Sequence, residues 1–106
     1  MPKGILYVES RPASPEQAAD YHQWYTETHM PEMVAIEGVV SARRLAPLGA
    51  DGPFVAIYEL EADDLAAVQA RVTEAGKAGK MSPPVGTSMD PPPKVTYLEE
   101  ISTCAP

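Results

Sequence analysis

The stretch Phe54–Leu60, which reads FVAIYEL, decides the fold of this chain. It is short and rich in β-branched and aromatic residues, which is typical of a β-strand. Because side chains alternate between the two faces of a sheet, Val55 and Ile57 share one face, while Phe54 and Tyr58 share the other. Both faces are largely apolar, so the pattern predicts a strand that is covered on both sides.

Three further segments have the same strand-like character: Lys3–Ser10, Gly38–Leu45 and Lys94–Ser102. The Gly- and Pro-containing segment 48–53 is typical of a hairpin connection between the second strand and the third. The first strand also has two apolar faces, with Ile5 and Tyr7 on one side and Leu6 and Val8 on the other. The sequence therefore predicts four strands, at least two of which are apolar on both faces.

Two of the intervening segments are expected to be helical. The first begins at Ser14, a good N-cap residue, with Pro15 at the first helical position and Gln17 completing a capping box. The second begins at residues 63–64, carries apolar residues at spacings of three and four, and ends at the glycines of segment 76–79. The resulting order of elements is β-α-β-β-α-β.

This order is typical of the ferredoxin-like fold, an α+β architecture in which a four-stranded antiparallel sheet carries two helices on one face. We expect residues 1–106 to form a single domain of this kind. Two helices cover only one face of the sheet, so the other would be an apolar patch larger than monomers usually expose. We therefore expect a homodimer in which two sheets pack face to face. The alternative is that the Pro-rich loop at residues 82–93 covers this face.

Five of the 12 prolines lie between residues 83 and 93. Proline has no backbone N–H and is excluded from regular ladders, so this segment is expected to be a loop. A loop of this length in a compact domain is either functional, as a lid, a binding loop or an arm onto a partner, or a stiff surface connection. Both interpretations remain open.

The composition excludes several classes of partner. The chain has 106 residues, with 8 Lys and Arg against 15 Asp and Glu, for a formal charge of −7. This charge repels nucleic acid, and no apolar run approaches the roughly 20 residues of a membrane span. The apolar run at residues 5–8 is too short for a signal peptide, and the lone Cys104 has no internal disulfide partner. We expect a soluble, cytoplasmic protein without nucleic-acid or membrane partners.

The first predicted helix carries the candidate chemistry. Its acidic and amide side chains gather on one side, while Tyr21, Tyr25 and His29 lie on the opposite side, with His22 at the edge and Trp24 on the flank. These aromatic and imidazole side chains point inward where a core helix usually has aliphatic residues. The helix also contains both histidines of the chain.

His29 has two interpretations. It is either an acid–base or ligand-orienting residue in an aromatic-lined pocket, or a buried histidine whose ring is hydrogen-bonded to the backbone. Tyr25 lies one turn away and would share a proton relay or donate to a developing oxyanion. Pro31 follows closely and is expected to kink or restart the helix beside His29.

The run Tyr21–Glu32 (YHQWYTETHMPE), followed by Ile36–Val39 (IEGV), resembles the EthD-like branch of the dimeric α/β-barrel superfamily. In that branch an aromatic and histidine-containing first helix leads to the start of the second strand, and a basic residue often follows, here Arg43 or Arg44. The resemblance implies a ferredoxin-like protomer, a dimer formed sheet to sheet, and a pocket between sheet and helices. It maps the histidine of the family onto His29.

The resemblance also implies a range of activities. Related pockets host polyketide cyclisation, decarboxylation, lactone isomerisation, haem breakdown and cofactor-free oxygenation, and other members have no known activity. The haem-degrading branch uses an asparagine, and this chain contains none. Two histidines seven positions apart plus Glu32 are a weak metal signal, so we expect neither a metal nor a cofactor.

The hypothesis is therefore a small cofactor-independent enzyme, of the cyclase, decarboxylase or isomerase type, that acts by proton transfer on a small apolar or aromatic carbonyl compound. His29 would move the proton and Tyr25 would assist. The candidate lining residues are Tyr7, Tyr21, His22, Trp24, Arg43, Tyr58 and Tyr97. The alternative is a non-catalytic ligand-binding or accessory protein with the same fold and pocket.

Overall fold

The computed structural model describes residues 1–49 and 51–106 and shows an α+β architecture with one four-stranded sheet. The strands are β1 (Lys3–Ser10), β2 (Val39–Leu45), β3 (Phe54–Glu61) and β4 (Lys94–Glu99). Their order across the sheet is β2-β3-β1-β4, and each neighbouring pair is antiparallel. The four predicted strands and their antiparallel pairing are confirmed, and β4 ends three residues earlier than expected.

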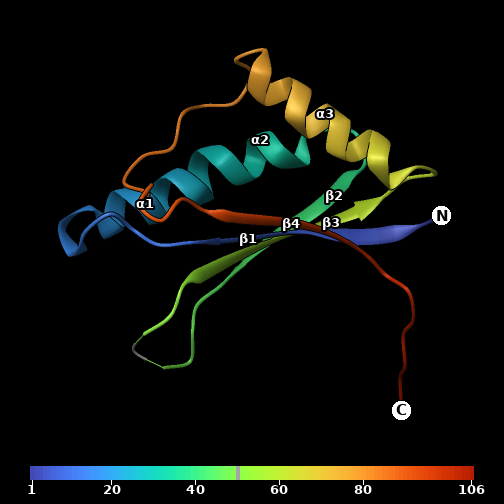
Figure 1. The fold of residues 1–106 in the computed structure, drawn as a ribbon, viewed down its shortest axis with the longest axis horizontal. Helices are drawn as coiled ribbons and strands as arrows, with labels where there is room; N and C mark the ends of the chain where they lie inside the picture. The colour runs from blue at the N-terminus through green and yellow to red at the C-terminus, as the bar shows by residue number, and fades with distance from the viewer. Residues whose placement is uncertain (50) are drawn as a thin grey trace.

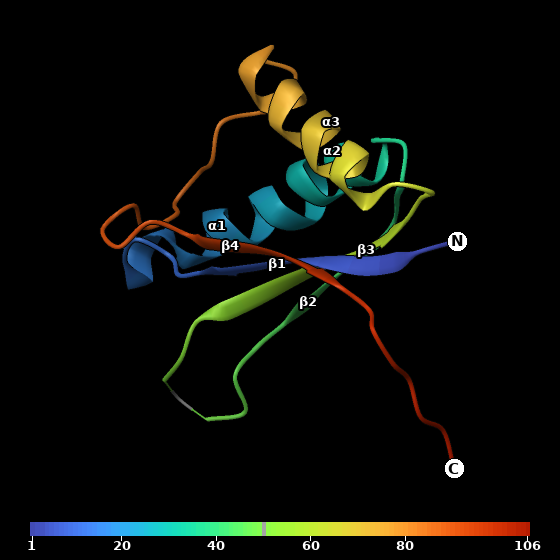
Figure 2. The same ribbon diagram turned by 45° about the vertical axis from the view of Figure 1, so that its right-hand side comes forward.

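Two helical segments lie against the sheet. The first is continuous and consists of a 3₁₀ turn (Pro15–Gln17), α1 (Ala18–Trp24), a π-helical turn (Tyr25–His29) and α2 (Met30–Val34); the second is α3 (Leu65–Lys77). Figures 1 and 2 show α1, α2 and α3 on the same side of the sheet. This arrangement is compatible with the ferredoxin-like fold. Among the described residues, none of the helices combines the length and apolar character needed to cross a membrane.

The start and the middle of the first helical segment differ from expectation. Ser14 is extended at the N-cap but its side chain makes no capping hydrogen bond, so the capping box does not form. Pro31 does not break the helix. Instead the Met30 N–H bonds to the Tyr25 carbonyl, five residues back, and the chain widens into a π-helical turn. This widening accommodates the ring of Pro31 and its missing N–H.

The core lies between the sheet and the helices. Cross-strand partners such as Leu6 and Tyr58, or Val39 and Leu60, are buried on the helix side of the sheet. Val68 of α3 is fully buried against this layer. The even-numbered face of β3, which reads Phe, Ala, Tyr, Leu, is therefore the one that meets the helices.

The opposite face of the sheet has no helix over it (Figures 1 and 2). It carries the alternate positions of the strands, including Ile5, Val55, Ile57 and Leu98. The Pro-rich loop does not cover it, so that alternative is wrong: the loop lies on the helix side, where the Ala13 N–H donates to the Gly86 carbonyl at 2.7 Å. The uncovered face is therefore open to solvent, and Leu98 on it is 49% exposed.

Candidate functional site

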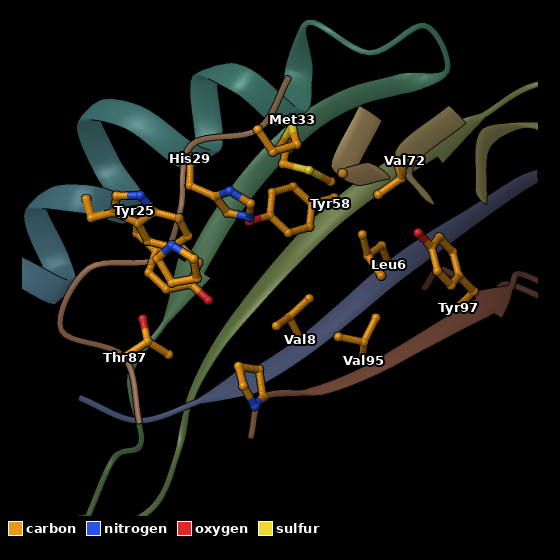
Figure 3. Close-up of a pocket in the computed structure, with 15 residues that line it drawn as sticks. Leu6, Val8, Tyr25, His29, Met33, Tyr58, Val72, Thr87, Val95 and Tyr97 are labelled. Carbon is orange, nitrogen blue, oxygen red and sulfur yellow. The ribbon is translucent and has the colours of Figure 1, made fainter. Parts of the chain in front are cut away.

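A cavity of about 280 Å³ lies between the sheet and the helical layer (Figure 3). Its walls come from β1, β3 and β4, from the first helical segment and α3, and from the loop that precedes β4. Aliphatic, aromatic, proline and methionine side chains make up most of the lining, and among the described residues no Lys, Arg, Asp or Glu side chain lines it. The cavity therefore suits an uncharged and largely apolar ligand.

His29 is the one ionisable nitrogen base in this lining. Its ring stacks on the indole of Trp24, with centroids 4.5 Å apart and planes 14° apart. Its ring is nearly perpendicular to those of Tyr25, at 5.5 Å, and Tyr58, at 6.1 Å. The Nδ1 atom is buried and has no hydrogen-bond partner among the described residues. One of the two interpretations of His29 was a buried ring hydrogen-bonded to the backbone. The Nδ1 atom makes no such bond to the described residues.

The surroundings of His29 favour the neutral imidazole. Burial lowers the pKa of His29 below its usual value of 6.5, and the nearby Glu32 carboxylate partly opposes this effect. A neutral imidazole can accept a proton near pH 7. The stacked indole and the carboxylate would both favour the imidazolium once it forms.

Tyr25 lines the cavity with its ring, but its hydroxyl is engaged elsewhere. The hydroxyl lies 3.1 Å from the buried Ser10 Oγ, which is also 2.6 Å from the Tyr21 hydroxyl. Burial raises the pKa of Tyr25, while the hydrogen bond with Ser10 lowers it in part. Its phenol is thus part of a buried hydroxyl cluster rather than a free donor.

Arg44 lies behind this cluster. Its guanidinium stacks over the Tyr25 ring at 4.3 Å and donates from Nη1 to His22 Nδ1 at 3.0 Å. Burial lowers the pKa of His22, and the positive charge of Arg44 lowers it further. Arg44 therefore holds Tyr25 and His22 from the side away from the cavity.

Four buried polar atoms in the cavity lining lack a hydrogen-bond partner among the described residues. They are Trp24 Nε1, His29 Nδ1, Tyr58 Oη and Thr87 Oγ1. Burial strongly raises the pKa of Tyr58, so its phenol stays protonated. Unsatisfied buried polar atoms are uncommon in native proteins. The described residues contain six of them: these four in the cavity lining, and Nε and Nη2 of Arg44 behind it.

The loop before β4 forms one wall of the cavity through Met81, Pro84, Thr87 and Pro93. Hydrogen bonds hold this loop in place at several points. Ser82 donates from its backbone N–H to Glu32 at 3.0 Å and from its hydroxyl at 2.8 Å. These two bonds are the main reason that the pKa of Glu32 is lowered.

Further along, the loop is held against the start of the chain and α1. The Ser88 N–H donates to the Arg11 carbonyl at 2.8 Å. Gly86 has φ +69°, and a Cβ there would lie 2.9 Å from the Gln17 carbonyl oxygen. The loop is thus a fitted wall of the cavity, which favours the functional interpretation of the Pro-rich segment.

The structure brings some of the predicted site residues together and separates others. Trp24, Tyr25, His29, Tyr58 and Tyr97 line the cavity. Two candidates, Tyr7 and Arg43, lie on the uncovered face, where the Tyr7 hydroxyl donates to Glu9 and Arg43 pairs with Glu59 at 3.5 Å. The remaining two, Tyr21 and His22, pack behind the cavity around Arg44 and Phe54.

The sequence did not single out Ser10 or Thr87 as site residues, and it offered Arg44 only as an alternative to Arg43. Alternation along the first strand places Ser10 on the face of Leu6 and Val8 but gives it no role, whereas Thr87 lies in a loop whose sequence has no periodicity. In the described part of the chain, no group of three or more His, Cys, Asp or Glu side chains is arranged to hold a metal ion. Comparisons of this chain with protein families, curated proteins and solved structures find no match.

Proposed function

We propose that this protein is a small enzyme that needs no cofactor and moves a proton on a small apolar or aromatic carbonyl compound. The proposal rests on the placement of His29, with a pKa lowered by burial and an unpartnered ring nitrogen, in the wall of a largely apolar cavity. Cyclisation, decarboxylation or isomerisation of a carbonyl compound can proceed with a single positioned base of this kind.

The cavity volume limits the ligand to one or two rings. An apolar cavity of about 150 Å³ holds benzene, and this cavity is about 280 Å³. The absence of charged side chains from its described lining disfavours a carboxylate or phosphate, because neither would find a counter-charge. An uncharged ligand with a polar atom directed at His29 fits best.

His29 would act as the base and then as the acid. In its neutral form it accepts a proton from carbon, and the resulting imidazolium is stabilised by the Trp24 ring and by the charge of Glu32. It then returns the proton to another atom of the same ligand. The cavity supplies orientation and excludes water, so that the proton is not exchanged with solvent at every step.

We also propose that the chain belongs to the EthD-like group that its first helix resembles, and that two copies pack through their uncovered sheet faces. The support is the group of apolar side chains on the side without helices, Ile5, Val55, Ile57 and Leu98, which lie beside the Arg43–Glu59 ion pair. Covering this face would finish the burial of both sides of β1 and β3.

The test is proton exchange from carbon in D₂O, with 2-tetralone as the probe. This ketone has two fused rings, no charge and acidic protons beside its carbonyl group. The wild-type protein should accelerate their exchange, as followed by proton NMR, and His29→Gln should lose about 10²- to 10⁴-fold of that acceleration. Equal rates in the two proteins would remove the role of His29. Saturable binding without exchange would support the non-catalytic, ligand-binding alternative.

A further inference from the structure

We infer that the Tyr58 hydroxyl is the group that binds the ligand's carbonyl oxygen beside His29, and that the preferred substrates are uncharged ketones with a removable proton beside the carbonyl. This inference rests on the proposed function and deepens it. It assigns the donor role to a residue of β3 rather than to Tyr25.

The position of Tyr58 supports this role. The residue is 1% exposed in the middle of β3, lines the cavity, and has a hydroxyl without a hydrogen-bond partner among the described residues. Its ring is perpendicular to that of His29, with centroids 6.1 Å apart. Figure 3 shows the Tyr58 hydroxyl directed toward the imidazole ring. A donor and a base therefore lie next to each other in the cavity lining.

The other cavity tyrosines are less suited to this role. The Tyr25 hydroxyl is bonded to Ser10 at 3.1 Å. Tyr97 is only half-buried, and Figure 3 shows it beyond Leu6, at the far end of the cavity from His29. Only Tyr58 combines a free hydroxyl with proximity to His29 in the described lining.

The chemistry of a buried phenol fits a donor. Burial raises the pKa of Tyr58, so the phenol keeps its proton and can donate a hydrogen bond at any physiological pH. Fixed donors aimed at an oxygen that gains negative charge are among the strongest contributors to catalysis. A neutral carbonyl would accept this bond weakly and the enolate formed from it strongly, so the bond favours the reacting state.

The proposed step balances without any co-reactant. The bond between the α-carbon and its hydrogen breaks, and the proton moves to the ring nitrogen of His29 on the cavity side. The electron pair forms a carbon–carbon double bond, and the carbonyl oxygen takes the negative charge while it accepts the Tyr58 hydrogen bond. The imidazolium then returns the proton to carbon or to oxygen, which completes exchange or isomerisation.

The experiment compares three variants that each lose a single phenolic oxygen. Tyr58→Phe should exchange the α-protons of 2-tetralone about a hundred-fold more slowly than wild type. Tyr25→Phe, which loses the bond with Ser10 but keeps the ring, should keep far more of the rate. Tyr7→Phe, on the uncovered face of the sheet, is the matched control and should keep the wild-type rate.

A second measurement compares binding of 2-tetralone with binding of tetralin, the same skeleton without the carbonyl group. Wild type should prefer the ketone, and Tyr58→Phe should lose that preference while it binds tetralin as well as wild type does. A protein that prefers the ketone through Tyr58 but does not exchange its protons would support this inference and contradict proton transfer as the function.

The opposite pattern would overturn the inference and leave the proposed function standing. In one such result, Tyr58→Phe exchanges the α-protons as fast as wild type. In the other, Tyr25→Phe loses as much of the exchange rate as Tyr58→Phe does. A wild-type protein with no preference for the ketone over tetralin would also overturn it. Circular dichroism of each variant establishes that the comparison is between folded proteins.

Discussion

The imidazole of His29 lies flat against the indole of Trp24, with ring centroids 4.5 Å apart and an angle of 14° between the planes. Trp24 is the only tryptophan of the chain. The stack holds the base in one orientation at the cavity wall, and it also places a fluorescent reporter in direct contact with that base. The ionisation of His29 can therefore be followed without any added probe.

The fluorescence of Trp24 should report a pKa for His29 below 6.5. Burial lowers this pKa, so the ring stays neutral as the pH falls from 7 and gains its charge only below the usual value. The charged ring then quenches the stacked indole. A fluorescence titration from pH 8 to 4 should show a midpoint below about 6.5, which His29→Gln abolishes and His22→Gln, the matched control, retains. A midpoint above 6.5 would contradict the account.

Tyr58→Phe should stabilise the protein while it weakens the function. The hydroxyl that it removes is buried and unpartnered, so its loss should raise the free energy of unfolding by about 1 kcal/mol. For a chain of this size the melting temperature should rise by about 4 °C. Tyr25→Phe, which removes a bonded hydroxyl, should lower the free energy of unfolding by a similar amount. Urea unfolding measures both changes, and the same sign for the two variants would count against the assignment.

Gly86→Ala should destabilise the protein because it disturbs the loop wall of the cavity. Gly86 has φ +69°, and a Cβ there would meet the Gln17 carbonyl oxygen at 2.9 Å. We expect a loss of about 1 to 3 kcal/mol in the free energy of unfolding, together with weaker binding of 2-tetralone.

Gly79→Ala is the control for this change. Gly79 also has a positive φ, +71°, but a Cβ there would meet nothing within 4 Å. Its substitution should cost only the backbone strain and leave binding of 2-tetralone close to the wild-type value. If the two variants bind the probe equally well, the loop is not a wall of the binding site.

A charge on the uncovered sheet face should disrupt the proposed dimer. Ile57→Lys replaces an apolar side chain between Tyr7 and Arg43 on that face with a charged one, and light scattering should then give the mass of one chain. Leu48→Lys is the control, because Leu48 is fully exposed in the loop between β2 and β3 and its substitution should leave a dimer. A monomeric wild-type protein at micromolar concentration would refute the dimer directly.

Much of the fold could be predicted from the sequence because its elements have clear local signals. The two apolar faces of β1 and β3, and the spacing of Tyr25 and His29 on one helix face, follow from the periods of strand and helix. The same two-sided pattern explains what could not be predicted. When both faces of a strand are apolar, alternation does not tell which one meets the helices, so Tyr7 and Tyr58 were equivalent candidates.

Arg43 and Arg44 illustrate a second limit. A register shift between Val39 and Ser41 places Val39 and Ala42 on the same face of β2, although they are an odd number of residues apart. Strict alternation from Val39 would put Arg43 on the helix side; the irregularity puts Arg44 there instead. A bulge of this kind depends on how the two strands pair, which the local sequence does not reveal.

The most direct test of the central claim, that the ligand meets His29, is NMR of the two histidine rings during a titration with 2-tetralone at pH 7. The chain has only two histidines, so their signals can be assigned with His22→Gln. The His29 signals should move until the cavity is saturated, while those of His22, which packs behind the cavity against Arg44, should stay in place. His29 signals that do not move at saturating ligand would contradict the claim.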